Sequence, residues 1–461
     1  MVNVGRIAGL LCLVSCAHGA DRAPVEPDSV GIAHYTVTIF DNLGGARVRA
    51  CFNGLALAGL VPMDTSAARR LRGAWIDGIP LETRDGRIRL SQQIQPACVE
   101  YETRFERSRF RLGDSSAVVL SQTQWLWRPE PFPTEVSTSV RFALPGDGQV
   151  SLSWPQSNGA YQPNRNAFFV ETFGVFGVFD RQAFSVANTR VEVARLGATP
   201  LDGDVRRWLT RAVQTTASVG GRFPGDRLQF VIVPVDDAGV EVAFGMVRRG
   251  GGSSILLLPS VDAEVADLEA DWVAIHELSH FWLPRLHAKD RWLSEGIATY
   301  LQEVLRARCG LQSSDRTWRR LREGFERGRR SGSGRPLSDE SRSMNRTGAY
   351  QRVYWAGTAF ALETDLRLRR RSHGESSLLT VLSDAQREWQ EEGGLVSASR
   401  VLAALEQASG ADFIEALGER YAASSDFPDT SYVDSPEYGD LRAQISAPAH
   451  GGCTLSGESS Q

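Results

Sequence analysis

The spacing of hydrophobic side chains changes along this chain of 461 residues, and this change constrains the fold most strongly. From about residue 34 to residue 193, apolar and polar residues alternate, as in Tyr35-Thr36-Val37-Thr38-Ile39-Phe40, and Gly, Pro and Asp interrupt the alternation. This pattern predicts many short strands in an antiparallel β-sandwich. From Asp262 to about Tyr421 the apolar residues recur at helical spacing instead. The chain is therefore expected to fold as an α+β protein.

A transitional region separates the two patterns. A helix-like run begins at Asp204, and the apolar runs 228–233 and 254–258 predict buried strands. The last 35 or so residues are rich in Ser, Asp, Gly and Pro. We predict four regions after a leader: a β-sandwich domain (16–200), an α+β domain (201–310), a helical domain (311–425) and an extended tail (426–461).

The N-terminus has the pattern of an export signal. A short apolar run, 7–14, follows a single arginine and is too short to span a bilayer. It ends in Leu13-Val14-Ser15-Cys16, which resembles a bacterial lipobox, so residues 1–15 are interpreted as a lipoprotein signal peptide and Cys16 as the acylated first residue. A plain secretory signal cut after Gly19 or Ala20 is the alternative. Either predicts export, with lipid anchoring at the bacterial cell envelope (outer membrane or periplasm) or secretion.

Charge and hydropathy exclude other classes. The chain has 51 basic and 55 acidic side chains and a net charge of −4. A nucleic-acid-binding protein is not expected from this balance. Beyond the first residues there is no apolar run long enough for a membrane span, so a polytopic membrane protein is excluded and membrane contact is expected only through the lipid anchor on Cys16.

Four cysteines follow Cys16: Cys51, Cys98, Cys309 and Cys453. An even number in an oxidising compartment suggests two disulfides, and four cysteines allow three pairings. Because the first two both lie in the strand-rich part, we favour 51–98 and 309–453. None of these cysteines has a Cys-x-x-Cys spacing, so a cysteine metal site is not indicated.

The segment His276-Glu277-Leu278-Ser279-His280 carries the strongest chemical signal. On a helix, positions i and i+4 lie about 40° apart around the axis and about 6 Å apart along it, so both imidazoles can reach one cation. Glu277 lies on the flank of that face, where it can act on a metal-bound water. The opposite side carries the apolar residues Ala274, Ile275, Leu278 and Trp282. The alternative interpretation is a helix with two surface histidines.

A second helix offers a third ligand. Pro284 ends the first helix, and a new helical pattern opens at Arg291 with Glu295 and Gly296. The intervening residues are enough for an antiparallel return that brings Glu295 to the histidines. Glycine inside a helix costs about 1 kcal/mol relative to alanine, so Gly296 suggests a close approach to the first helix. Two histidines, one carboxylate and an open fourth position describe a catalytic zinc site.

These motifs resemble those of a known group. HELSH followed by WLSEGIATY looks like the gluzincin metallopeptidases, the clan that contains thermolysin and the families M1 (aminopeptidases) and M61. The resemblance covers about 204–382. It implies that 201–310 is a thermolysin-like catalytic domain, that His276, His280 and Glu295 bind zinc, and that Glu277 is the general base.

The same resemblance extends to a later helix. Tyr354-Trp355-Ala356-Gly357 resembles the Tyr-x-x-Gly helix of families M1 and M61, which implies that Tyr354 donates a hydrogen bond to the oxyanion. Tyr350 lies one helical turn away and could compete for this role. The alternative for either tyrosine is ordinary half-buried packing.

One segment departs from the family pattern. Gly245-Met246-Val247-Arg248 stands where M1 enzymes have a Gly-x-Met-Glu-Asn motif, and the glutamate that holds a substrate amine has no counterpart. This difference weakens an aminopeptidase interpretation. Arg248 or Arg249 could instead meet a carboxylate, although a solvated arginine pair beside a glycine-rich turn is the favoured interpretation.

A basic segment follows the second helix of the motif. Anionic lipid or glycan could contact it, but Asp315, Glu323 and Glu326 dilute its charge, and a solvated helix and loop is favoured. Its arginines are Arg316, Arg319, Arg320, Arg322, Arg327, Arg329 and Arg330.

The sequence thus supports two functional hypotheses. The first is a zinc metallopeptidase that hydrolyses peptide bonds in a peptide or protein substrate through a metal-activated water, with Glu277 as general base. The second is a catalytically inactive gluzincin-fold lipoprotein that acts as a binding or assembly scaffold. The presence of Glu277 beside two histidines favours the enzyme, because a scaffold has no physical need for it.

Overall fold

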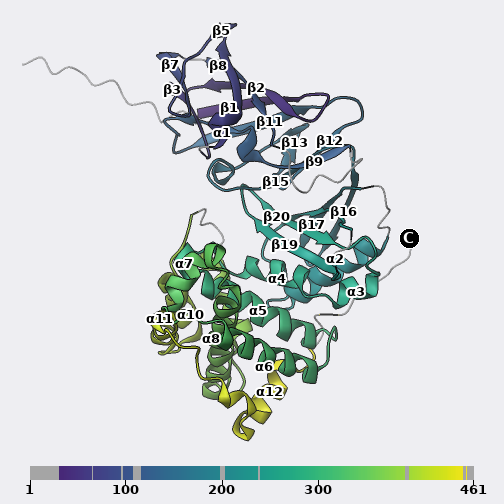
Figure 1. Ribbon diagram of the computed structural model, residues 1–461, viewed down its shortest axis with the longest axis vertical. Helices are drawn as coiled ribbons and strands as arrows, with labels where there is room; N and C mark the ends of the chain where they lie inside the picture. The colour runs from purple at the N-terminus through teal and green to yellow at the C-terminus, as the bar shows by residue number, and fades with distance from the viewer. Residues whose placement is uncertain are drawn as a thin grey trace, which may run out of the picture.

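The computed structural model describes residues 31–64, 66–94, 97–106, 116–197, 203–236, 239–389, 394–449 and 453 (Figure 1). The predicted signal peptide (1–15) and Cys16 lie outside these described residues. Within the described ranges, no helix combines the length and the apolar character needed to cross a bilayer. Figure 1 shows the strand-rich N-terminal part at the top, a separate sheet below it and the helices at the bottom.

Three sheets form the N-terminal part. The largest has the order β13-β14-β11-β1-β2-β8-β4-β5 and contains β1 (Gly31–Ile39), β2 (Gly45–Asn53), β4 (Leu71–Ile76), β5 (Ile79–Pro80), β8 (Ala97–Arg104), β11 (Val136–Ala143), β13 (Gln156–Ser157) and β14 (Ala160–Tyr161). The second sheet contains β10 (Trp127–Glu130), β3 (Leu57–Pro62), β7 (Arg87–Ile94) and β6 (Thr83–Arg84). The third contains β12 (Gln149–Leu152), β15 (Phe173–Gly177) and β9 (Ala117–Ser121), and the short helices nearby are α1 (Ser66–Arg70), η1 (Gln122–Gln124) and η2 (Arg165–Phe168).

Alternation along the strands builds the core of this part. Alternate residues of β1 are buried, and Trp125, Trp127 and Trp154 are fully enclosed. The disulfide Cys51–Cys98 joins β2 to β8, as the favoured pairing predicted. The expectation of purely antiparallel strands was wrong for one pair, because β1 runs parallel to β11. A long connection separates these two strands, so no hairpin forces them to be antiparallel.

A five-stranded mixed sheet lies next along the chain. Its order is β16 (Asp180–Val186), β17 (Thr189–Arg195), β18 (Arg227–Ile232), β20 (Ser253–Pro259) and β19 (Val242–Arg248). Strands β17, β18 and β20 are parallel, and β16 and β19 are antiparallel edge strands. Although β16 and β17 fall within the range predicted for the β-sandwich, they hydrogen-bond into this sheet because β17 pairs with the buried strand β18. The helices beside the sheet are α2 (Gly203–Ala217), α3 (Val265–Ala270) and α4 (Val273–Ser279).

The remaining chain is helical, as predicted. It contains η3 (His280–Trp282), η4 (Ala288–Asp290), α5 (Arg291–Arg308), α6 (Ser314–Arg330), α7 (Leu337–Thr347), α8 (Tyr350–Arg371), α9 (Leu378–Trp389), α10 (Ala398–Ser409) and α11 (Ile414–Ala423). Helices α5 and α8 cross where Gly296 meets Gly357, since a Cβ added to Gly296 would lie 2.2 Å from the Gly357 carbonyl carbon. Gly296 therefore permits close approach to α8, and the expectation that it faces the first helix of the motif was wrong.

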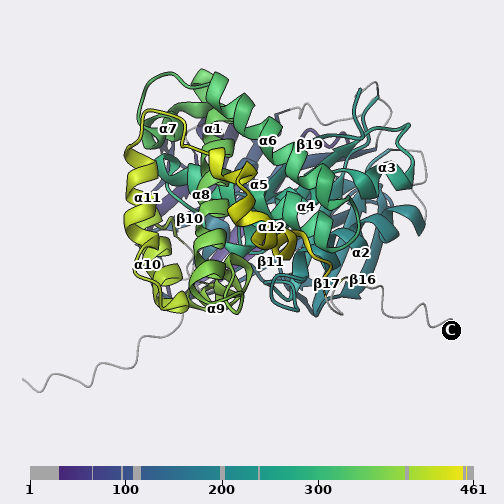
Figure 2. The same cartoon turned by 90° about the horizontal axis from the view of Figure 1, so that it is seen from below.

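The C-terminal segment is not simply extended, contrary to the prediction for 426–461. It forms η5 (Ser431–Asp434), η6 (Pro436–Tyr438) and α12 (Gly439–Ser446), and Figure 2 shows α12 crossing the helical part, where it contacts α5, α6 and α8. Ile445 of α12 is fully buried, and the hydroxyls of Ser314 and Ser446 lie 2.7 Å apart. Burial of this apolar side chain and these polar contacts stabilise a helix that polar composition alone did not predict.

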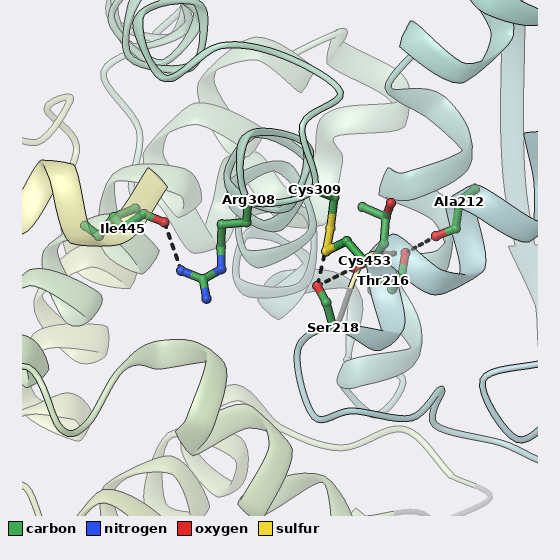
Figure 3. The surroundings of a disulfide bond; sticks show 8 residues. Ala212, Thr216, Ser218, Arg308, Cys309, Ile445 and Cys453 are labelled. Atoms are coloured by element: carbon green, nitrogen blue, oxygen red, sulfur yellow. Dashed lines mark hydrogen bonds between the residues drawn. A yellow bond between two sulfur atoms is a disulfide. The ribbon is translucent and has the colours of Figure 1, made fainter. Parts of the chain in front are cut away.

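A disulfide fastens the same segment to α5. Cys309, directly after the last residue of α5, is bonded to Cys453, the second favoured pairing. Figure 3 shows this bond together with Ser218, whose Oγ lies 3.8 Å from Cys309 Sγ, and with Arg308, whose guanidinium donates to the Ile445 carbonyl. The disulfide and the Arg308 hydrogen bond therefore both hold the C-terminal end of α5, the helix that carries Glu295 near its start.

Candidate metal and catalytic site

The first part of the candidate site is α4 with the turn that follows it. Asp271 Oδ1 accepts a hydrogen bond from the Val273 N–H over 2.7 Å, which satisfies one of the free donors at the start of the helix. The helix tightens into a 3₁₀ turn at His280. The residues of the predicted apolar stripe, Ala274, Ile275, Leu278 and Trp282, are all buried. The opposite face of the helix carries the two imidazoles.

Three side chains converge at this face. Oε2 of Glu295, on α5, lies 3.3 Å from Nε2 of His276 and 3.5 Å from Nε2 of His280. The ligand atoms of the three residues all lie within 4.8 Å of one another. The two imidazole rings are nearly perpendicular, with centroids 4.9 Å apart. The structure thus brings together the three residues expected to bind metal.

The hydrogen bonds of the imidazoles test whether this group fits a zinc ion. Nδ1 of His276 lies 2.8 Å from Oε1 of Gln302, and Nδ1 of His280 lies 3.0 Å from the hydroxyl of Ser294. Because an amide oxygen can only accept, Nδ1 of His276 carries a proton, and in the neutral imidazole Nε2 then offers its lone pair to a metal. Both Nε2 atoms face Glu295. Two imidazoles and one carboxylate arranged in this way fit the donor set of a catalytic zinc site.

Gln302 is itself oriented by its neighbour. Its amide nitrogen donates to Oε1 of Glu303 over 3.0 Å, so its oxygen is turned toward His276. Glu303 is buried, and its carboxylate lies 3.6 Å from the guanidinium of Arg306 and 3.8 Å from that of Arg320. A chain of contacts in α5 therefore determines which nitrogen of His276 is protonated.

Burial and charge set the protonation of the three converging residues. Burial lowers the pKa of His280 to about 4, which keeps this imidazole neutral and able to bind metal. Burial also tends to lower the pKa of His276, but the hydrogen bond with Glu295 and the charges of Glu277 and Glu295 outweigh it and raise that pKa. For Glu295, the nearby imidazoles outweigh burial and lower its pKa, so it stays ionised.

Glu277 lies against the edge strand β19. A Cβ on Gly245 would lie only 2.6 Å from Cγ of Glu277, so the strand passes directly over this side chain. Burial raises the pKa of Glu277 to about 7, although the charge of His276 and a hydrogen bond from the Val247 N–H act in the opposite direction. A carboxyl group with a pKa near neutrality is suited to accept and return a proton.

Tyr354 and Tyr350, the two tyrosines considered, differ clearly in position. The ring of Tyr354 stacks on that of His276, with centroids 5.8 Å apart and an interplanar angle of 12°. Burial, the charges of Glu295 and Glu277, and a hydrogen bond with Glu295 raise the pKa of Tyr354, so its hydroxyl stays protonated. Tyr350 is exposed, and its hydroxyl lies 3.5 Å from Oδ1 of Asn345. Of the two, only Tyr354 adjoins the converging side chains.

The arginine pair at the end of β19 has protein partners. Arg248 lies 3.0 Å from the carboxylate of Glu171. Arg249 donates to the backbone carbonyls of Leu283, over 2.7 Å, and of His280. Arg249 is half-buried against these carbonyls, and burial lowers its pKa to about 10. It thus satisfies carbonyl groups at the end of the motif helix.

Comparison with known proteins extends the geometric result. No protein-family model matches the chain, and no curated protein matches it by sequence. Among solved structures, an aminopeptidase N family protein from Idiomarina loihiensis superimposes with a TM-score of 0.68 at 18% identity, covering 87% of this chain and 77% of that one. An M1 zinc metallopeptidase from Deinococcus radiodurans gives a TM-score of 0.52 at 17% identity, covering 87% and 94%. The chain has the fold of M1 zinc metallopeptidases.

A third match adds a ligand to this comparison. A variant of the Deinococcus radiodurans M1 enzyme was solved with a Tyr-Ser-Ala substrate, and it superimposes with a TM-score of 0.52 at 16% identity over 87% of this chain and 94% of that one. The expected resemblance to the gluzincins and family M1 is confirmed at the level of the fold. The α+β class is likewise confirmed.

Sequence reasoning missed two residues that support the histidines, Gln302 and Ser294. A signal for both was present, because Ser294 directly precedes Glu295 and Gln302 follows it by seven residues, on the same face of the helix. Polar residues on the ligand-bearing face of a buried helix could have been assigned to the outer contacts of a metal site.

Proposed function

We propose that this protein is a zinc-dependent metallopeptidase that hydrolyses peptide bonds, with Glu277 as general base. The observation that carries the proposal is the convergence of His276, His280 and Glu295, with both Nε2 atoms turned toward one carboxylate oxygen. The fold of M1 zinc metallopeptidases and the peptide bound to one of them support a peptide as substrate. In this proposal the three converging residues hold the zinc ion.

A zinc ion in such a site acidifies water and polarises a carbonyl group. Glu277, with its pKa near 7, accepts the proton of the attacking water and returns it to the leaving amine. The hydroxyl of Tyr354 donates a hydrogen bond to the carbonyl oxygen as negative charge develops on it, an effect worth a few kcal/mol in comparable sites. Gln302 and Ser294 hold the imidazoles in the orientation that binding requires.

The location of the protein forms part of the proposal. We propose that it is exported and anchored at the cell envelope through a lipid on Cys16. The two disulfides, Cys51–Cys98 and Cys309–Cys453, support export because such bonds persist in oxidising compartments. The division into an N-terminal β-sandwich, a thermolysin-like catalytic domain and a helical domain belongs to the same proposal.

Replacement of the general base tests this function. The Glu277→Gln variant should retain its zinc and its folded structure and lose peptide hydrolysis by about 10²-fold or more. The matched control is Glu415→Gln, a change of the same kind on α11. An active Glu277→Gln protein would refute the mechanism. A wild-type protein that binds zinc and cleaves none of a broad peptide library would favour the scaffold hypothesis.

A further inference from the structure

A cavity of about 630 Å³ opens beside the candidate catalytic site. Its walls come from the start of α4, the middle of α5, the N-terminal part of α8 and the arginine-rich helix α6. Trp272, Gln302 and Tyr354 belong both to these walls and to the surroundings of His276. The ring of Trp272 lies 5.6 Å from that of His276, and that of Tyr354 lies 5.8 Å from it. The cavity therefore adjoins His276 through these three side chains.

The cavity is basic on the side formed by α6. Arg316, Arg319, Arg320 and Arg327 line it together with Glu323, and they recur at the spacing of one helical face. The other arginines of α6 lie elsewhere, and two of them pair outside the cavity, Arg322 with Asp434 and Arg329 with Glu326. The sequence had favoured a solvated helix, but the structure separates its arginines into two groups.

Two of the four cavity arginines are engaged by the protein. Arg320 lies 3.8 Å from the buried carboxylate of Glu303. Arg327 donates to Gln351 over 3.3 Å and stacks on the ring of Trp355 at 5.2 Å. Arg316 and Arg319 have no carboxylate within salt-bridge distance among the residues that the structure describes, and both are exposed to the cavity. Their guanidinium groups are thus available to an external anion.

We propose that this cavity binds a carboxylate of the peptide substrate and that Arg316 and Arg319 determine this specificity. The inference rests on the proposed function, since it places the carboxylate on a peptide held at the histidines. Guanidinium groups pair with carboxylates through charge-assisted, often bidentate hydrogen bonds. The carboxylate can belong to an acidic side chain or to the C-terminus of a peptide, and the experiment distinguishes these two sources.

Binding to the zinc-loaded Glu277→Gln protein tests the inference without hydrolysis. The probes are hexapeptide amides with one Glu moved along the chain, the same peptides with Gln, and the Gln peptides with a free C-terminal carboxylate. We expect at least one acidic peptide to bind about tenfold more tightly than its neutral match, and this preference to weaken as salt is raised. A preference for Glu amides indicates a side-chain carboxylate, and a preference for free acids indicates the C-terminus.

Arginine variants locate the effect. Adding R316Q and R319Q to the Glu277→Gln protein should remove the preference and leave the affinity for neutral peptides within about twofold. The matched control is R330Q, which removes one charge from α6 outside the cavity. Circular dichroism confirms that each variant is folded.

Defined outcomes overturn the inference. Equal affinity for acidic and neutral peptides, absence of measurable binding by every acidic peptide, or a preference that survives R316Q/R319Q would each contradict it. These outcomes are distinct from failure of the proposed function, which would appear as loss of zinc binding or as hydrolysis by the Glu277→Gln protein.

Discussion

Gln302 accepts a hydrogen bond from Nδ1 of His276 over 2.8 Å, from a position two helical turns beyond Glu295 on α5. One helix therefore provides both a proposed metal ligand and the group that orients another. We expect Gln302→Leu to lower zinc affinity about 10- to 100-fold, because the imidazole loses the partner that fixes its protonated nitrogen. Competition with a fluorescent zinc chelator measures this change.

The control for that experiment is Gln407→Leu, the same substitution at an exposed position of α10. It should leave zinc affinity unchanged. If Gln302→Leu bound zinc as tightly as the wild type, the hydrogen bond would have no part in orienting His276.

Tyr354 is predicted to act on the reaction rather than on substrate binding. Tyr354→Phe removes the hydroxyl and keeps the ring that stacks on His276. Loss of one donor to a developing oxyanion typically lowers kcat about 10²-fold, so we expect a loss of that order with little change in KM. Steady-state kinetics on a neutral peptide provide both parameters. The competing assignment to Tyr350 predicts the reverse, with kcat lost in Tyr350→Phe and kept in Tyr354→Phe.

The contact between Gly296 and Gly357 limits what α5 and α8 can accommodate. A Cβ on Gly296 would lie 2.2 Å from the Gly357 carbonyl carbon, in backbone that cannot yield without moving a helix. We expect Gly296→Ala to lower the free energy of unfolding by about 1–3 kcal/mol. Urea denaturation measures this change. The control is Gly332→Ala, where the nearest atom to a new Cβ lies 3.7 Å away, and stability should stay within about 0.5 kcal/mol of the wild type. Equal stability of both variants would show that the helices are not tightly apposed.

Asp271 should make the fold less stable as pH rises. Burial raises its pKa to about 6, while hydrogen bonds from Val273 and Trp272 and the charge of Arg306 act in the opposite direction. A carboxyl with a raised pKa in the folded state favours folding when protonated, and this contribution is lost as pH rises through the unfolded and then the folded pKa. Asp271→Asn is neutral at every pH and retains an oxygen that can accept from the Val273 N–H.

The comparison is between this variant and the wild type at two pH values. The difference in unfolding free energy between Asp271→Asn and the wild type should shift by about 1 kcal/mol in favour of the variant when the pH is raised from 5 to 8. Denaturation at both pH values measures the difference. A constant difference would mean that Asp271 has an ordinary pKa.

Much of this architecture could be predicted from local patterns. Alternation predicted the strand β1, and helical spacing predicted the face that carries His276 and His280. Contacts between distant segments could not be predicted in the same way. The parallel pairing of β1 with β11, and the insertion of β16 and β17 into the five-stranded sheet, depend on which strands meet in three dimensions.

In the candidate site, too, local patterns could be predicted and contacts between distant segments could not. The spacing of its motif placed the three proposed ligands, because a short loop leaves α5 few ways to return to α4. The partner of Gly296 was predicted wrongly, because a glycine signals close approach without indicating which helix approaches. The basic segment of α6 was visible in the sequence, but the cavity was not, because its walls form only when α5 and α8 pack beside these arginines.

Zinc content measures the central claim most directly. The purified wild type and the Glu295→Ala variant are each dialysed against a buffer that contains a trace of zinc. Inductively coupled plasma mass spectrometry then gives the number of zinc ions per folded chain. The account predicts about one zinc per wild-type chain, as in three-ligand catalytic sites, and a large loss of zinc in the folded Glu295→Ala protein. A wild-type protein without metal, or a Glu295→Ala variant that binds zinc as fully as the wild type, would contradict it.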